Sequence, residues 1–292
     1  MEPSVVAPSN EEAVEAWNGP LFERFVAFRE LLTTGLGAHG ERALAMYPPS
    51  PGERALDVGC GFGDTAQRLA ELVGPEGEVV GIDASERFID VARQEAAEAG
   101  ATNTSFLVGD VQVTDFGRPF DYAFSRFGTM FFANPVAALR NVRVALAPGG
   151  RLSMVVWRRK LDNDWMHRAE LIVKGFLERN DESDEPTCGP GPFSMADADT
   201  TSSILVSAGF EDVSLTRSDI EIKIGDDVEA AMDLVTALGP AGEVIRLAGA
   251  EAERVRPQID TALREGLSEF SGPNGVWAPA STWIVGARAP SA

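Results

Sequence analysis

Cysteine and histidine are both scarce in this chain of 292 residues, which has two of each. Cys60 and Cys188 are too few for a disulfide framework, and no Cys-x-x-Cys pair is present to hold zinc. His39 and His167 lie far apart and outside any His-Glu-x-x-His pattern. The sequence therefore predicts no metal site, and it favours a reducing compartment, the cytoplasm.

Long apolar runs and a surplus of basic residues are missing too. No uncharged apolar run reaches the roughly 18 residues that predict a membrane span. The N-terminus has neither the basic start nor the apolar stretch of a signal peptide. Forty-five acidic residues oppose 25 basic ones, for a formal net charge of −20, and such a surface repels phosphate backbones. We expect a small-molecule partner, no nucleic acid and no membrane span, and either a monomer or a homodimer.

Apolar residues, by contrast, make up 44% of the chain, which is enough for a globular core. In the first half of the chain, short apolar strands alternate with helical stretches. This alternation predicts parallel βαβ units in an α/β fold, with a doubly wound, mostly parallel sheet covered on both faces. The strands are expected at residues 54–58, 78–83, 105–109, 121–126 and 151–157.

Residues 56–63 (LDVGCGFG) join the first expected strand to a helix through three glycines. Glycine permits a sharp bend and lets a ligand approach the backbone closely. The dinucleotide fingerprint Gly-x-Gly-x-x-Gly needs its third glycine one position later, where Asp64 stands. Asp57 ends the strand, and its carboxylate suits an ammonium group and opposes a pyrophosphate. The loop therefore predicts a ligand that is cationic at this point.

Two further carboxylates end the next two strands. Asp83 lies twenty-four residues after Gly59, where an acidic side chain can accept hydrogen bonds from both hydroxyls of a ribose. Asp110 follows the third strand, where a carboxylate can accept from an adenine amino group while the N–H of Val111 reaches a ring nitrogen. The carboxyl ends of parallel strands meet at one edge of a sheet. An amino acid joined to adenosine matches this order of groups.

These stretches resemble the class I S-adenosylmethionine-dependent methyltransferases, and in particular the branch named for ubiquinone and menaquinone C-methylation. The resemblance implies a Rossmann-like, seven-stranded sheet with an antiparallel edge strand and helical insertions. It also implies S-adenosyl-L-methionine as cofactor, S-adenosyl-L-homocysteine as its product, and in-line methyl transfer to a small organic molecule. The matching segments, within residues 54–157, are LDVGCGFGD, VVGIDAS, FLVGDVQ, FDYAFSRFGTMFF and ALRNVRVALAPGGRLSMVVW.

The resemblance assigns roles to the residues of this region. Asp57 with the first two glycines of the loop contacts the methionine moiety, Asp83 takes the ribose, and Asp110 with Val111 takes the adenine. Ser125 lies beside the sulfonium. The expected cofactor site is Asp57, Gly59, Cys60, Gly61, Gly63, Asp83, Ala84, Asp110, Val111, Ser125 and Arg126.

Candidates on the substrate side are fewer. Trp17 is expected either in a lid over the cofactor or simply packed in the core, and Phe127 and Trp165 are further candidates for the substrate pocket. His167 is the histidine placed to act as a catalytic base, and a plain helical histidine is the alternative interpretation. His39, flanked by alanine and glycine, is expected at the surface beside a helix break.

The pattern divides the chain into a flexible tail at 1–16 and a single methyltransferase domain at 17–292. Within the domain we expect a lid helix at 17–50, a cofactor-binding core at 51–157, substrate-side insertions at 158–211 and 225–281, and edge strands at 212–224 and 282–289. Two other functions stay open: an NAD-dependent oxidoreductase on a Rossmann sheet, and a non-catalytic S-adenosylmethionine-binding protein.

Overall fold

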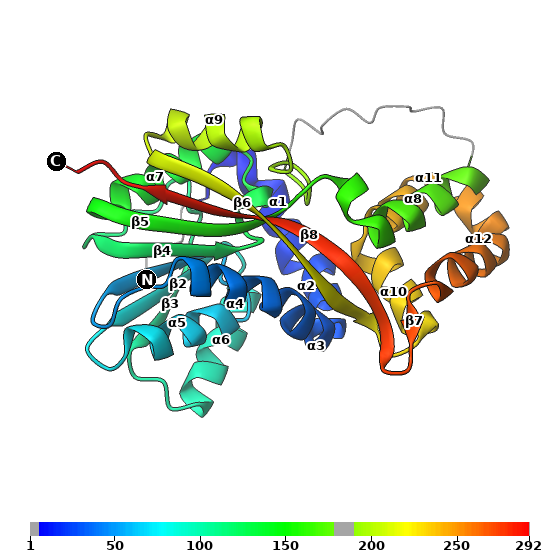
Figure 1. Ribbon diagram of the computed structural model, residues 1–292, viewed down its shortest axis with the longest axis horizontal. Coiled ribbons are helices and arrows are strands. Elements are labelled where there is room, and N and C mark those ends of the chain that lie inside the picture. The colour runs from blue at the N-terminus through cyan, green and yellow to red at the C-terminus, as the bar shows by residue number, and fades with distance from the viewer. Residues whose placement is uncertain (1–5, 178–189, 292) are drawn as a thin grey trace.

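One mixed sheet forms the centre of the protein in a computed structural model that describes residues 6–177 and 190–291 (Figure 1). Cys188 and the first five residues of the expected tail lie outside these ranges. The strand order is β3-β2-β1-β4-β5-β8-β6, and a two-residue strand, β7, pairs with β8. The strands are β1 Arg54–Val58, β2 Glu78–Asp83, β3 Thr104–Val108, β4 Phe120–Arg126, β5 Leu146–Trp157, β6 Glu211–Gly225, β7 Ser271–Gly272 and β8 Gly275–Arg288.

The pairing confirms the predicted fold class. Strands β1 to β5 pair in parallel, whereas β8 runs antiparallel between β5 and β6. The strand that closes the chain therefore lies one place inside the edge, and β6 is the outermost strand on that side. The chain order reverses between β1 and β4, and the carboxyl ends of strands at such a switch point are where open α/β sheets bind ligands.

Helices cover both faces of the sheet (Figure 1). On one side lie α4 (Gly37–Met46), α5 (Asp64–Val73) and α6 (Glu86–Glu98), and on the other lie α7 (Pro135–Ala145) and α9 (Ala198–Ala208). Helix α5 shows why the sequence folds this way, because its apolar residues recur at helical spacing and face the sheet. Its buried apolar residues are Ala66, Leu69, Ala70 and Val73.

A second group of helices gathers at the far end of the long β6–β8 ribbon (Figure 1). Helix α8 (Asp164–Phe176) packs there against α11 (Pro240–Ala248) and α12 (Ala250–Ser268), and α10 (Val228–Leu238) contacts both of these. These helices lie in the segments expected as substrate-side insertions. None of the helices in the described ranges is long and apolar enough to cross a membrane.

The N-terminal region differs from the expected tail and single lid helix. A short 3-10 turn (Pro8–Asn10) leads into α1 (Glu11–Asn18), so the described end of the expected tail is mostly helical. Asn10 followed by two glutamates is a helix-start signal that the sequence interpretation passed over. Residues 8–16, expected as a tail, are therefore helical in this structure, and the flexibility of the segment stays a prediction.

The expected lid helix is also broken into pieces. Helices α2 (Pro20–Ala27) and α3 (Arg29–Leu31) and a π-helical turn (Leu32–Leu36) precede α4. The first break falls at Gly19, because proline fits the first turn of a new helix but not the interior of a continuing one. Apolar periodicity does not reveal such a break, because apolar residues recur at helical spacing on both sides of it.

Candidate functional site

The glycine loop after β1 is held by the backbone of β2. The N–H groups of Gly59 and Cys60 both donate to the carbonyl of Ile82, at 2.9 and 3.0 Å. Gly63 begins α5 with φ of +81°, and a Cβ at that position would lie 2.8 Å from the ring of Phe106. A side chain there would be both strained and blocked, so this position requires glycine.

Asp57 lies inside the protein at the end of β1, with 1% of its surface exposed. Burial raises the pKa of its carboxyl group to about 8; Arg126 lowers it, and Asp64 and Asp83 raise it further. Its Oδ2 atom has no hydrogen-bond partner among the residues that the structure describes. A buried carboxylate without a donor is costly, and a cationic group would supply both a donor and the compensating charge.

Asp83 is fixed between the glycine loop and the start of α6. Its Oδ2 accepts from the N–H of Gly61 at 3.0 Å, and its Oδ1 accepts from the N–H of Ser85 at 2.9 Å. Burial raises the pKa of Asp83, while the N–H donors, including that of Ala84, lower it. The two carboxylate oxygens have about four acceptor sites together, so Asp83 keeps acceptor capacity beyond its N–H donors.

Asp110 is buried and bonded to the N-terminal segment, which the sequence did not indicate. Its Oδ1 accepts from the N–H of Gln112 at 2.9 Å. Its Oδ2 accepts from the N–H of Ala7 at 3.0 Å and from the side-chain amide of Asn10 at 2.8 Å. Amide hydrogens therefore stand at the position predicted for an adenine amino group, next to the buried Val111.

Trp17 links this N-terminal segment to the core. Its ring makes edge contacts with Phe25, Phe88 and Phe131, at centroid distances of 5.3, 6.2 and 5.1 Å. The neighbouring Asn18 accepts a hydrogen bond from the hydroxyl of Ser85, the N-cap of α6, at 2.9 Å. Packing of Trp17 is thus shown, and its role in a lid stays a prediction.

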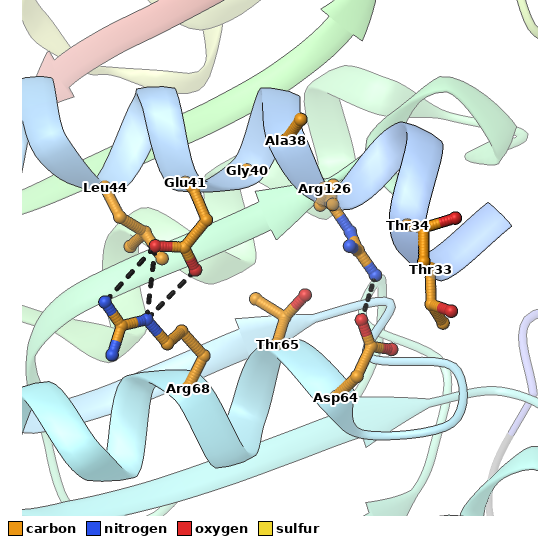
Figure 2. A pocket seen from close by; sticks show the side chains of 11 residues that line it. Thr33, Thr34, Ala38, Gly40, Glu41, Leu44, Asp64, Thr65, Arg68 and Arg126 are labelled. Atoms are coloured by element: carbon orange, nitrogen blue, oxygen red, sulfur yellow. Dashed lines mark hydrogen bonds and ion pairs between the residues drawn. The ribbon is translucent and has the colours of Figure 1, made fainter. Parts of the chain in front are cut away.

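Ser125 and Arg126 close the site at the end of β4. The Ser125 hydroxyl is buried and donates to the carbonyl of Val58 at 2.7 Å, which ties β4 to β1 across the switch point. Arg126 turns toward α5, where it forms an ion pair with Asp64 at 2.5 Å (Figure 2). The pair thereby places a fixed positive charge close enough to lower the pKa of Asp57.

A pocket of about 340 Å³ lies beside this ion pair, between α4 and α5 (Figure 2). A second pair, Glu41 with Arg68 at 3.0 Å, lies across it. The charges in the pocket are therefore balanced within it. The lining residues are Thr33, Thr34, Gly37, Ala38, Gly40, Glu41, Leu44, Asp64, Thr65, Arg68 and Arg126.

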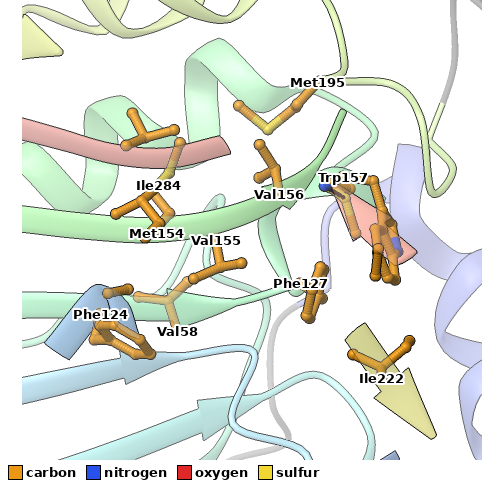
Figure 3. Packing of buried hydrophobic residues seen from close by; sticks show 14 of the residues in the cluster. Val58, Phe124, Phe127, Met154, Val155, Val156, Trp157, Met195, Ile222 and Ile284 are labelled. Carbon is orange, nitrogen blue, oxygen red and sulfur yellow. Dashed lines mark hydrogen bonds between the residues drawn. The ribbon is translucent and has the colours of Figure 1, made fainter. Parts of the chain in front are cut away.

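Phe127 follows β4 and has φ of +61°, which is unusual for a bulky residue. Its ring lies 4.6 Å, centroid to centroid, from that of Trp157 at the end of β5 (Figure 3). The Trp157 ring also contacts Trp165 of α8 at 6.5 Å and His39 of α4 at 6.0 Å. The structure thus brings the predicted pocket residues Phe127 and Trp165 into one aromatic cluster.

His39 overturns the expectation of a surface residue, because none of its surface is exposed. Its Nδ1 lies 3.1 Å from the hydroxyl of Thr282, and its Nε2 is buried without a partner in the described part of the chain. Burial lowers the pKa of His39 to about 4, aided by Arg42 and opposed by Asp219. Helical spacing was the overlooked signal, since Ala43, one turn further on, is buried too.

His167 lies on α8, partly buried, and its Nδ1 also has no partner in the described ranges. Two aromatic side chains of the expected substrate-side insertions are more open to solvent: Phe176 is 39% exposed and Trp277 is 41% exposed. Over the described residues, no group of three or more His, Cys, Asp and Glu side chains is placed to hold a metal ion.

Comparison with known proteins finds similarity to one family of enzymes. Residues 49–186 match a family model described as a methyltransferase domain. The match begins just before β1 and extends past α8, so it covers the glycine loop and all three carboxylates.

Two curated relatives carry similar domains. Aklanonic acid methyltransferase DauC of Streptomyces sp. (strain C5) is 38% identical over 115 residues, which are 39% of this chain and 52% of that protein. Demethylmenaquinone methyltransferase of Geobacillus kaustophilus is 39% identical over 100 residues, which are 34% of this chain and 43% of that protein. The chain thus spans about half the length of the curated relatives it matches.

Among solved structures, phosphoethanolamine N-methyltransferase 2 of Haemonchus contortus, in complex with S-adenosyl-L-methionine, aligns with a TM-score of 0.56. The alignment covers 98% of this chain and 61% of that one, at 14% sequence identity. At such identity the likeness concerns the fold, and the methyltransferase fold expected from the sequence is confirmed.

Proposed function

We propose that this protein is an S-adenosyl-L-methionine-dependent methyltransferase that acts on a small organic molecule. One observation carries the proposal: Asp57, Asp83 and Asp110 lie at or just after the ends of three adjacent parallel strands, beside a glycine loop that the β2 backbone holds in place. Ammonium, ribose hydroxyl and adenine amino groups are donors that three carboxylates in this order would accept. The matched domain and the names of the curated relatives support the same activity.

The residues fit this cofactor in two respects. The unpaired Oδ2 of Asp57 is a buried acceptor that needs a donor, and the methionine ammonium would supply one with a compensating charge. Asp83 accepts backbone N–H groups on both oxygens and keeps further acceptor capacity, which suits the hydroxyls of a ribose.

Adenine can reach its proposed position at Asp110 only if the N-terminal segment moves. Asp110 is 2% exposed, and Ala7 and Asn10 bond to it. We propose that residues 7–18 swing away to admit the adenine, which then takes up the acceptor capacity of Asp110 and the N–H of Val111. Trp17, on the same helix, moves with this segment.

When bound, S-adenosyl-L-methionine supplies an electrophilic methyl group on a positively charged sulfur. The protein's part is to hold the acceptor atom in line behind that group, and proximity and orientation supply roughly 7–11 kcal/mol of such a barrier. Ser125 holds the end of β4 against β1, and the buried rings of Phe127 and Trp157 exclude water. A base is needed only for an acceptor that keeps its proton, and His167 stays a candidate for that role.

The acceptor, partners and location are proposals of the same kind. The relatives' names mention aklanonic acid and demethylmenaquinone, which supports a small organic acceptor here. We expect no nucleic-acid partner, because the net charge is −20. The free, buried thiol of Cys60 supports a reducing cytoplasm as the location.

Calorimetric titration tests the proposal against its alternatives. We expect saturable binding of S-adenosylmethionine and none of NADH, because Asp64 occupies the place of the third glycine in a dinucleotide loop. Binding of NADH alone would instead favour an oxidoreductase. Binding of S-adenosylmethionine without methyl transfer to a broad panel of phenols, carboxylic acids, amines and thiols would favour a non-catalytic sensor.

A further inference from the structure

The ends of β4 and β5 carry a cluster of side chains that the cofactor does not account for. We define the aromatic cluster as Phe127, Trp157, Trp165 and His39. All four are buried, and Trp157 contacts the other three. Figure 3 shows the Phe127 and Trp157 rings packed together at the ends of their strands. The cluster therefore lies at the same sheet edge as the three carboxylates, beyond Ser125.

Two polar atoms of this cluster lack hydrogen-bond partners. The Nε2 of His39 and the Nε1 of Trp165 are both buried and unpaired within the described ranges. Folded proteins pair more than about nine in ten buried polar groups, so exceptions mark strain or a missing ligand. These two unpaired atoms belong to side chains that both contact Trp157. They indicate a ligand whose polar groups bind among the aromatic side chains of the cluster.

The backbone at Phe127 gives independent support. A phenylalanine at φ of +61° is strained, and such strain persists only where the surroundings enforce it, most often at functional sites. Here the strained backbone places the ring against Trp157 and edge-on to His39. A relaxed backbone would send the ring elsewhere.

The surroundings of His39 define what its free nitrogen can do. The Thr282 hydroxyl lies 3.1 Å from Nδ1 and 3.4 Å from the carbonyl of Ser218, to which it donates. Thr282 then accepts from Nδ1–H, which leaves Nε2 with a lone pair. The charged groups around the ring are Arg42 on its own helix and Asp219 on β6, and burial keeps the imidazole neutral at pH 7.

We propose that the aromatic cluster recognises the methyl acceptor, and that this acceptor is an aromatic compound whose hydroxyl group donates a hydrogen bond to Nε2 of His39. Trp165 Nε1 then donates to a second oxygen atom of the same compound. The inference rests on the proposed function and deepens it by naming the substrate class. Flat rings suit stacking among aromatic side chains, and a buried acceptor nitrogen discriminates for a hydroxyl.

Binding of two matched probes tests this without catalysis. Equilibrium dialysis measures the affinity of 1-naphthol and of naphthalene for the chain saturated with S-adenosylhomocysteine. We expect the wild-type chain to bind 1-naphthol about fivefold more tightly, the effect of one hydrogen bond. His39→Leu should bind both probes equally, and His39→Gln, whose amide oxygen can replace Nε2 as acceptor, should restore part of the preference.

S-adenosylmethionine titration of the same variants separates the possible failures. We expect its affinity to be unchanged in His39→Leu and His39→Gln, which also shows that both variants fold. If S-adenosylmethionine binds but the wild-type chain shows no preference for 1-naphthol, or His39→Leu keeps the preference, this inference is overturned and the proposed function stands. If S-adenosylmethionine does not bind the wild-type chain, the proposed function itself fails.

Discussion

The two halves of the proposed ligand-binding edge are built in different ways. At β1 to β3, each functional group sits at or just after the end of its own strand, inside a short motif of consecutive residues. At β4 and β5, the aromatic cluster is assembled from α4, the ends of both strands and α8, and Thr282 of β8 supports it. The first half is local in sequence, and the second depends on the tertiary fold.

This difference shows which constraints act on each half. A cofactor of fixed shape demands a tight loop and acceptors at set positions, so glycine and aspartate occur at fixed spacings. An acceptor pocket needs only apolar surface and a few polar atoms, which many elements can supply. The same fold can thus keep one cofactor site while the acceptor half varies.

The strongest test of the local half is Asp83→Ala. The change removes both acceptor oxygens offered to the ribose, and each hydrogen bond to a charged group contributes about 1.5–3 kcal/mol. We expect the dissociation constant for S-adenosylmethionine to rise about 100-fold or more in calorimetry, with an unchanged circular dichroism spectrum. Asp90→Ala, an exposed carboxylate on α6, is the matched control. Unchanged affinity in Asp83→Ala would remove the ribose assignment.

Much of the cofactor half could be predicted from the sequence, and little of the acceptor half. Strand ends, the glycine loop and the carboxylates follow from patterns over a few residues. His39 was placed at the surface because its neighbours are alanine and glycine, whereas its burial depends on β5 and β8 packing against α4. Asn10 contacts Asp110, which lies one hundred residues further along the chain. No local sequence pattern predicts such a contact.

Asp57→Asn should separate stability from binding. Burial raises the pKa of Asp57 from 3.8 in the unfolded chain to about 8, so the folded state binds the proton more tightly. Its stabilising contribution is complete below pH 3.8 and is lost as pH rises through 8. Asparagine stays neutral, so we expect the thermal midpoint of the cofactor-free variant to exceed that of the wild type by a margin that widens from pH 5 to pH 9.

The same variant should bind S-adenosylmethionine about tenfold more weakly at pH 8, because an ionised carboxylate strengthens a hydrogen bond to an ammonium group. Wild-type affinity should also rise between pH 6 and pH 8, as Asp57 ionises, while that of the variant stays flat. A variant that is less stable at pH 9, or that keeps the pH dependence, would show that Asp57 is not the cation-binding group.

A kinetic effect is expected at the N-terminal segment, which bonds to Asp110. Asn10→Ala removes one of the two donors that hold this segment on Asp110. Losing one hydrogen bond to a charged group, at the lower end of about 1.5–3 kcal/mol, raises the open fraction about tenfold. If opening limits entry, the association rate constant for S-adenosylmethionine in stopped-flow fluorescence should rise by the same factor.

Glu12→Ala offers the matched control, because Glu12 is exposed on α1, two residues beyond Asn10, and its loss leaves Asp110 untouched. The dissociation rate constant decides what the segment does after binding. An increase in Asn10→Ala means that the segment closes again over the bound cofactor, as a lid does, since a lid slows exit as well as entry. Equal association rate constants in the wild type, Asn10→Ala and Glu12→Ala would mean that the cofactor enters by another path. The contact between Asn10 and Asp110 would then serve the fold alone.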